Sequence, residues 1–89
     1  MLQLDLKHHA ERFIKRLSPK QAGQIERKLE MLARDPSPAD SKQLRGSIYR
    51  GTDIGEYRII YKVEGNFLRI PLIGKRNDDE VYRKLKRME

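Results

Sequence analysis

The strongest constraint on the fold is a pair of alternating segments joined by a two-residue turn signal. Residues 56–63 and 67–73 each alternate between two faces, which is the period of a half-buried strand. Gly65-Asn66 between them is typical of a tight hairpin turn. The chain is therefore predicted to contain an antiparallel hairpin, and the face expected to point into the core consists of Tyr57, Ile59, Tyr61, Val63, Leu68, Ile70 and Leu72.

Pro71 lies inside the second of these segments and conflicts with a regular strand. A proline has no backbone N–H to donate to a strand ladder, so prolines in sheets are confined to edges and bulges. We therefore expect Pro71 to mark either a sheet edge or a bulge in the second strand of the hairpin.

Two helices are predicted ahead of the hairpin. Apolar residues recur at helical spacing over 8–17, and a second stripe extends over 22–33. Ser18 is expected to cap the second helix, with Pro19 at the first helical position and a glutamine at the third. The segment 35–38 contains two prolines and stops this helix, because proline cannot continue the hydrogen-bond ladder. The two helices are predicted to form a helical hairpin.

The remaining elements complete the predicted order. Residues 1–7 alternate leucine with polar residues and predict a first strand, and residues 47–50 predict another, with a turn over 51–55. Asn77 with a glutamate three residues later resembles a capping box, and the apolar stripe of a last helix follows at Val81, Leu85 and Met88. The order β-α-α-β-β-β-α predicts a single α+β domain over residues 1–89, an antiparallel sheet with the helical hairpin packed on one face and a C-terminal helix.

Basic residues outnumber acidic ones along this chain. There are 20 Lys and Arg residues against 13 Asp and Glu residues, for a formal net charge of +7 at pH 7. From Lys42 onward the balance is 12 basic against 7 acidic residues, so most of the surplus lies in the second half. Such a surplus favours polyanions through phosphate contacts and counterion release. Nucleic acid is therefore the expected class of partner.

The absence of cysteine excludes disulfides and thiolate metal sites. No apolar stretch approaches the roughly 20 residues that a membrane-spanning helix needs, and the first ten residues lack the apolar run of a signal peptide. These features favour a cytoplasmic protein that acts without a membrane.

Familiar catalytic motifs are missing, since the sequence contains no glycine-rich phosphate loop, no zinc-ligand spacing and no nucleophile elbow. His8 and His9 are adjacent at the start of a predicted helix, where neighbours do not share a face, so we interpret them as surface residues. The acidic run 78–80 opens the last predicted helix, where carboxylates stabilise the helix dipole. Neither group predicts a metal site, and no cofactor is expected.

A set of cationic and phenolic side chains remains. Arg58 and Lys62 share the strand face opposite to the predicted core, and two cations follow Gly74 where the last strand ends. Arginine matches the geometry of phosphate oxygens, and neighbouring cations favour the ionised form of a phenol. Such groups can cleave RNA without a metal ion, because the reaction needs proton transfer and stabilisation of a charged phosphorane. The candidate residues are Arg50, Arg58, Lys62, Arg69, Lys75, Arg76 and Tyr82.

Three segments resemble the RelE/ParE toxin superfamily: residues 43–46, 54–61 and 73–82. The Gly-x-Tyr-Arg pattern in the second segment is shared across the superfamily, whereas Gly-Lys-Arg with a tyrosine six residues later is similar to the RelE ribonucleases in particular. The resemblance implies the toxin of a type II toxin–antitoxin system, a metal-independent endoribonuclease that cleaves mRNA in the ribosomal A site and inhibits translation. The partners it implies are a RelB-like antitoxin, the ribosome and mRNA.

The same resemblance implies roles for single residues. Arg58 would hold the substrate phosphate, Arg76 would stabilise the developing charge, and Tyr82 would orient or help deprotonate the nucleophile. Lys75, Lys62 and Arg69 are candidate substrate-binding residues. The best-known RelE has two lysines, spaced i and i+2 on the preceding strand, for acid–base work. Here Arg50 and Thr52 align with them, and because arginine stays protonated the general base is left unassigned.

Two alternatives remain open at this point. ParE-type relatives of the same fold inhibit DNA gyrase and cut no RNA, and those members do not generally need the pair Arg76 and Tyr82. The missing second lysine motivates another reading, in which the protein is a non-catalytic relative that only binds RNA or the ribosome.

Overall fold

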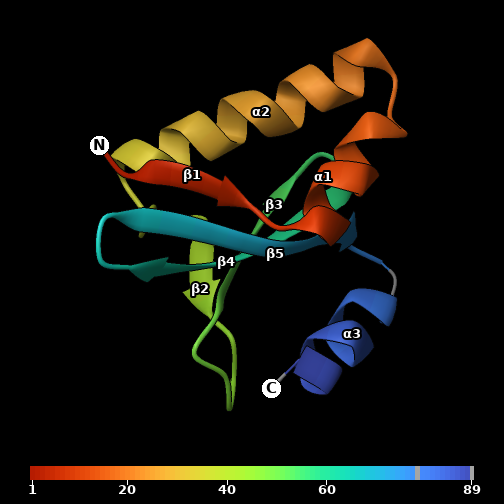
Figure 1. The fold of residues 1–89 in the computed structure, drawn as a ribbon. Helices are drawn as coiled ribbons and strands as arrows, with labels where there is room; N and C mark the ends of the chain where they lie inside the picture. Colours follow the sequence, from red (N-terminus) through yellow and green to blue (C-terminus); the bar gives the residue numbers. More distant parts are fainter. Residues whose placement is uncertain (78, 89) are drawn as a thin grey trace.

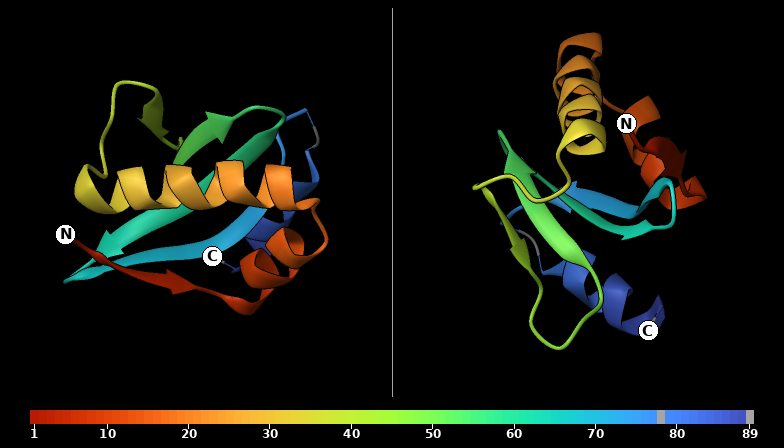
Figure 2. Two further views of the ribbon diagram at one scale, coloured as in Figure 1. Left: turned by 90° about the horizontal axis from the view of Figure 1, so that it is seen from above. Right: turned by 90° about the vertical axis from the view of Figure 1, so that its left-hand side faces the viewer.

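One five-stranded sheet with helices on both faces forms the protein in the computed structural model, which describes residues 1–77 and 79–88 (Figure 1). The strands lie in the order β1-β5-β4-β3-β2. Helices α1 and α2 cover one face, and α3 lies against the other (Figure 2). The elements are β1 (Gln3–Leu6), α1 (His8–Lys15), α2 (Pro19–Arg34), β2 (Ser41–Gln43), β3 (Arg50–Ile54), β4 (Tyr57–Glu64), β5 (Phe67–Lys75) and α3 (Glu80–Met88).

The bounds of α2 follow from its capping residues. The Ser18 hydroxyl accepts a hydrogen bond from the backbone N–H of Gln21 at 3.4 Å, and Pro19 occupies the first helical position. The helix ends at Arg34, directly before the proline-containing segment. The predicted start and end of this helix are thus confirmed. Within the described residues, none of the helices is long and apolar enough to span a membrane.

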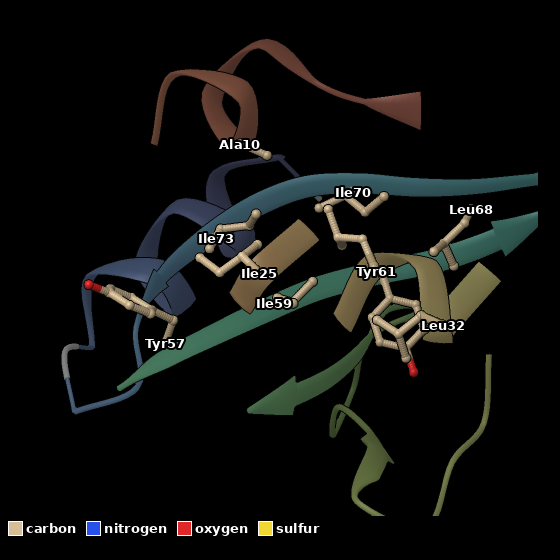
Figure 3. Close-up of a cluster of buried hydrophobic side chains, with 10 residues drawn as sticks. Ala10, Ile25, Leu32, Tyr57, Ile59, Tyr61, Leu68, Ile70 and Ile73 are labelled. Atoms are coloured by element: carbon tan, nitrogen blue, oxygen red, sulfur yellow. The ribbon is translucent and has the colours of Figure 1, made fainter. Parts of the chain in front are cut away.

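The main core lies between the sheet and the helices α1 and α2 (Figure 3). The phenol of Tyr61 is fully buried there, and its hydroxyl donates a hydrogen bond to the backbone oxygen of Pro36 at 2.6 Å. This bond satisfies the polar end of the ring and ties β4 to the segment that follows α2. The main core consists of Ala10, Ile25, Leu29, Leu32, Tyr57, Ile59, Tyr61, Leu68, Ile70 and Ile73.

A second core holds α3 on the opposite face. Val81 and Leu85 of α3 pack there against Leu44, Ile60 and Leu72. Gly74 lies beneath the helix, where an added Cβ would stand 3.3 Å from the Cβ of Val81. The missing side chain therefore lets α3 approach the sheet closely.

Pro71 lies at a bulge, which is one of the two outcomes expected for it. Ile60 faces Leu72 and Lys62 faces Arg69, so Tyr61 of β4 is opposed by two residues of β5. The extra residue reverses the alternation of β5. The prediction that Leu72 shares a face with Leu68 and Ile70 is therefore wrong, and Leu72 packs in the second core.

The strand predicted at 47–50 and the turn predicted at 51–55 are also wrong. The strand in this region is β3, and the turn that follows it is Gly55-Glu56, with φ +57° at Gly55. Gly51 is predicted as a turn residue, but it lies inside β3, where it pairs with Lys42 and Ile60. An added Cβ there would stand 3.2 Å from the Leu44 side chain. The short strand β2 was not predicted, since it has no apolar alternation and forms by pairing with β3.

Two further predictions need correction. β1 pairs with β5 in parallel, so the sheet is mostly and not wholly antiparallel. Alternation along a strand carries no information about the direction of its neighbour, which is why the sequence could not distinguish the two cases. The last helix begins at Glu80, not directly after Asn77.

Adjacent residues of α2 test the main core. Leu32 is fully buried, whereas Met31 is 59% exposed. We expect Leu32→Ala to lower the free energy of unfolding by about 2–5 kcal/mol, because it leaves a cavity. Met31→Ala should change it by less than about 0.5 kcal/mol. Urea unfolding followed by circular dichroism measures both, and equal losses would contradict this assignment of the core.

Candidate active site

An ion pair between Asp53 and Arg58 forms the centre of the candidate site. The two residues are directly opposite each other on β3 and β4, so their side chains leave the sheet on the same face. Arg58 Nε lies 2.6 Å from Asp53 Oδ1, and Arg58 Nη2 lies 3.0 Å from Asp53 Oδ2. This bidentate geometry fixes the plane of the guanidinium group.

Tyr82 reaches the same arginine from α3. Arg58 Nη1 donates a hydrogen bond to the Tyr82 hydroxyl, and the guanidinium carbon lies 5.5 Å from the centre of the Tyr82 ring. The ring also packs against the second core. Tyr82 thus packs through its ring and makes a polar contact through its hydroxyl.

The charges of the site favour its ionised forms. The pKa of Asp53 is lowered, mainly by the hydrogen bonds from Arg58, and the nearby charges of Arg76 and Lys42 lower it further. The pKa of Arg58 is raised, mainly by hydrogen bonding to Asp53, although burial opposes this. Asp53 is therefore an anion and Arg58 a cation at neutral pH.

Lys75 and Arg76 lie at the end of β5, and both are exposed. The backbone N–H of Arg76 donates to the backbone oxygen of Glu56 at 2.9 Å, which holds the turn after β5 against the start of β4. Because the charge of Arg76 acts on Asp53, its side chain is within electrostatic reach of the ion pair. The structure therefore brings Arg58 and Tyr82 into contact and places Arg76 within reach of their charges. Lys75 pairs with Tyr57, so its side chain leaves the sheet on the opposite face, toward α1.

Arg50 is not part of this group. It pairs with Tyr61, whose ring lies in the main core, so Arg50 leaves the sheet on the face opposite to Arg58. Its Nη2 donates to Ser41 Oγ at 2.9 Å, and its Nε is buried without a hydrogen-bond partner. Thr52 lies on that face as well and donates to the backbone oxygen of Asp40 at 3.2 Å. The β3 residues that face the candidate site are Gly51 and Asp53, one position away from the aligned pair.

Lys62 and Arg69 share the sheet face of Arg58 but lie farther along it. They are opposite each other, and Lys62 is four residues from Arg58 on the same strand, a separation of about 13 Å. Arg69 pairs with Asp5 at 2.5 Å and with Glu64 at 2.8 Å, and it holds the pKa of each carboxyl below its usual range. Lys62 also pairs with Glu64, at 3.2 Å.

Two residues of the site were missed in the sequence, Asp53 and Lys42. A hollow of about 320 Å³ lies beside the ion pair, and Lys42, Gly51, Asp53 and Arg58 contribute to its lining. A turn at Gly55-Glu56 places Asp53 opposite Arg58, so opposite charges flanking that turn were the available signal. No pattern in the sequence indicated that Lys42 belongs to the site, because it lies on β2, a strand that was not predicted.

The residues considered as metal ligands are placed as follows. His8 is exposed, and His9 is half-buried with Nε2 3.0 Å from Lys84 Nζ. Asp78 lies outside the described residues. Glu80 pairs with Lys84 at 3.1 Å. Residues 1–77 and 79–88 contain no group of three or more histidine and carboxylate side chains that could hold a metal ion.

Comparisons with solved structures show that this fold is shared with RelE-like toxins. The isolated RelE toxin of E. coli aligns over 100% of both chains with 24% sequence identity and a TM-score of 0.75. RelE-like chains in two complexes also align. The E. coli RelBE toxin–antitoxin complex covers 84% of this chain and 96% of that chain, with 22% identity and a TM-score of 0.73. The YoeB–YefM complex of Staphylococcus aureus covers 82% and 94%, with 20% identity and a TM-score of 0.69.

No protein-family model and no curated protein sequence matches the chain. The RelE-like α+β fold that the resemblance implied is nonetheless confirmed by the structural comparisons.

The Asp53–Arg58 pair predicts a pH dependence of stability. Because the pKa of Asp53 is lowered on folding from its ordinary value of 3.8, the ionised pair stabilises the fold above that pH, and the contribution is lost as the pH falls through the lowered pKa. We expect Asp53→Asn to melt below the wild type at pH 7 and to approach it as the pH falls below 3.8 and through the lowered pKa of Asp53. Glu30→Gln, which neutralises an exposed carboxylate on α2, is the control. A melting difference that is constant with pH would contradict the assigned role of the pair.

Proposed function

We propose that this protein is the toxin of a type II toxin–antitoxin system and that it cleaves mRNA on the ribosome without a metal ion. The observation that carries the proposal is the contact of Arg58 with Tyr82, with Arg76 close by, on a RelE-like fold. These are the three residue types, at the three positions, that the resemblance assigns to phosphate binding, charge stabilisation and orientation of the nucleophile.

The reaction proposed is attack of a ribose 2′-oxygen on the adjacent phosphorus. The 2′-hydroxyl passes its proton to solvent water, the bond from phosphorus to the 5′-oxygen breaks, and that oxygen takes a proton from solvent water. Arg58 and Arg76 stabilise the phosphorane, which carries more negative charge than the substrate phosphate. Tyr82 orients the 2′-hydroxyl and assists its deprotonation, since its own hydroxyl is held by Arg58. Lys75 is an auxiliary phosphate contact.

Asp53 has a positioning role in this proposal. It engages Nε and Nη2 of Arg58 and leaves Nη1 directed at Tyr82. The guanidinium group is thereby held in one plane before the substrate arrives, which lowers the entropy lost on phosphate binding. Arg50 has a structural role in this proposal and does not contact the substrate, because it lies on the opposite face of the sheet and bonds to Ser41.

The proposed partners are an antitoxin, the ribosome and mRNA. A protein with a formal net charge of +7 is attracted to RNA in general, so an inhibitor has to mask its basic surface. The comparison structures include complexes of toxins with their antitoxins, RelBE and YoeB–YefM. A RelB-like partner with acidic and apolar helices is the expected inhibitor.

Two variants test the proposal on ribosomes programmed with mRNA. Arg76→Ala should lower the cleavage rate by about 10²–10³, as loss of one charge-assisted stabiliser does, and leave stability nearly unchanged because Arg76 is exposed. Tyr82→Phe keeps the ring and removes the hydroxyl, and should lower the rate at least about tenfold. Arg27→Ala, on the exposed side of α2, is the matched control and should cleave at the wild-type rate.

Each alternative gives a different outcome in these assays. If the wild type binds ribosomes but never cuts mRNA, the protein is a non-catalytic relative, a reading favoured by Gly51 and Asp53 at the β3 positions that face the site. If the wild type cuts no mRNA and inhibits DNA supercoiling by gyrase, the ParE-like function replaces the proposed one. Full cleavage by both Arg76→Ala and Tyr82→Phe would mean that the reaction is centred elsewhere.

A further inference from the structure

A second hollow, of about 720 Å³, lies between α1, the end of β5 and α3. Phe13, Ile73 and Val81 contribute apolar surface to its lining. Four cationic side chains line it, against one carboxylate, that of Glu80; the cations are Arg12, Arg16, Lys75 and Lys84. We call this hollow the α1–α3 groove.

The cations of the groove come from both of its walls, α1 and α3. Arg12 and Arg16 are four residues apart and therefore lie on the same side of α1. On the opposite wall, Lys84 lies 3.1 Å from Glu80 Oε1 and 3.0 Å from His9 Nε2, so its ammonium group is fixed at the groove. The pKa of His9 is lowered, first by burial and then by the charge of Lys84, with Arg16 and Arg12 adding to the effect. The groove therefore has a net positive potential despite Glu80.

Continuity with the candidate active site indicates what binds in the groove. Lys75 lines the groove, and Arg76, the next residue, acts on Asp53 at the reaction site. A chain of phosphates leaving the reaction site can pass from Arg76 to Lys75 and then between α1 and α3. Phe13 adds an aromatic ring to the lining, held edge-on against Tyr57 with ring centres 5.7 Å apart. Cations interleaved with an aromatic ring are typical of surfaces that bind single-stranded nucleic acid.

We propose that the α1–α3 groove binds the phosphodiester backbone of the RNA strand beyond the bond that is cut. The inference rests on the proposed function and adds to it a second binding site on the far side of β5. Binding there is independent of base sequence, because it depends on phosphate contacts.

The test uses a single-stranded RNA oligomer with every 2′-hydroxyl methylated, which cannot be cleaved by 2′-oxygen attack. Its affinity for the full-length protein is measured by fluorescence anisotropy over a range of salt concentrations. The variant Arg12→Gln/Arg16→Gln removes two groove charges, and we expect binding to weaken about tenfold and the salt slope to fall by about 1.4. The control Lys20→Gln/Arg27→Gln removes two exposed charges from α2 and should leave the slope nearly unchanged. Should the groove variant melt early, Arg12→Gln alone should lower the slope by about 0.7.

Three results would overturn the inference. Equal weakening in the groove and control variants would mean that net charge alone attracts RNA. A glutamate-rich peptide is measured in the same way. If the groove variant lost affinity for this peptide but bound RNA as the wild type does, the groove would be a site for an acidic protein. Absence of RNA binding by the wild type would remove the groove as an RNA site. Cleavage of mRNA on programmed ribosomes is measured in parallel with the wild type. If the wild type cleaves mRNA but the groove binds no RNA, the groove inference fails and the proposed function remains; if the wild type does not cleave, the proposed function fails as well.

Discussion

The bulge at Pro71 determines which side chains the two faces of the sheet receive. By reversing the alternation of β5, it directs Ile73 into the main core and Leu72 into the second core. It also places Gly74 beneath α3 and Lys75 on the side of α1. In the unreversed register Lys75 would lie under α3, and the helix could not approach the sheet closely. The contact between Tyr82 and Arg58, and the cationic wall of the α1–α3 groove, both depend on this one irregularity.

The candidate site combines a rigid part with an exposed part. Arg58 is fixed by Asp53 and Tyr82, so one cation has a defined orientation and a partly neutralised charge. Arg76 and Lys75 are exposed at a strand end. Such a division suits phosphate chemistry, in which one group positions the substrate and others respond to the charge that develops in the transition state. The ion pairs of Arg69 with Asp5 and Glu64 are a contrast, since they commit that cation to joining β1, β4 and β5.

Local signals in the sequence predicted the helices and the central hairpin well. Ser18 and Pro19 define the start of α2, and Gly65-Asn66 defines the hairpin, because capping and turn geometry depend on a few adjacent residues. Strand direction and register were not predictable in this way. β2 has three polar residues and forms through its pairing with β3, and the tight space at Gly51 is set by the side chain of Leu44, seven residues away. Asp53 was missed for the same reason, since its place opposite Arg58 depends on where the preceding turn begins. The resemblance supplied Arg58, Arg76 and Tyr82, but it aligned Arg50 one register position away from the site.

The chemistry of the cut ends tests the central claim most directly, that this cluster directs a ribose 2′-oxygen to the neighbouring phosphorus. mRNA recovered from programmed ribosomes after exposure to the protein can be analysed at the new termini by mass spectrometry. The account predicts a 2′,3′-cyclic phosphate, or the 3′-phosphate formed from it, on the upstream fragment and a 5′-hydroxyl on the downstream fragment. A 3′-hydroxyl with a 5′-phosphate would mean that water attacked the phosphorus, and it would contradict the mechanism assigned to Arg58, Arg76 and Tyr82.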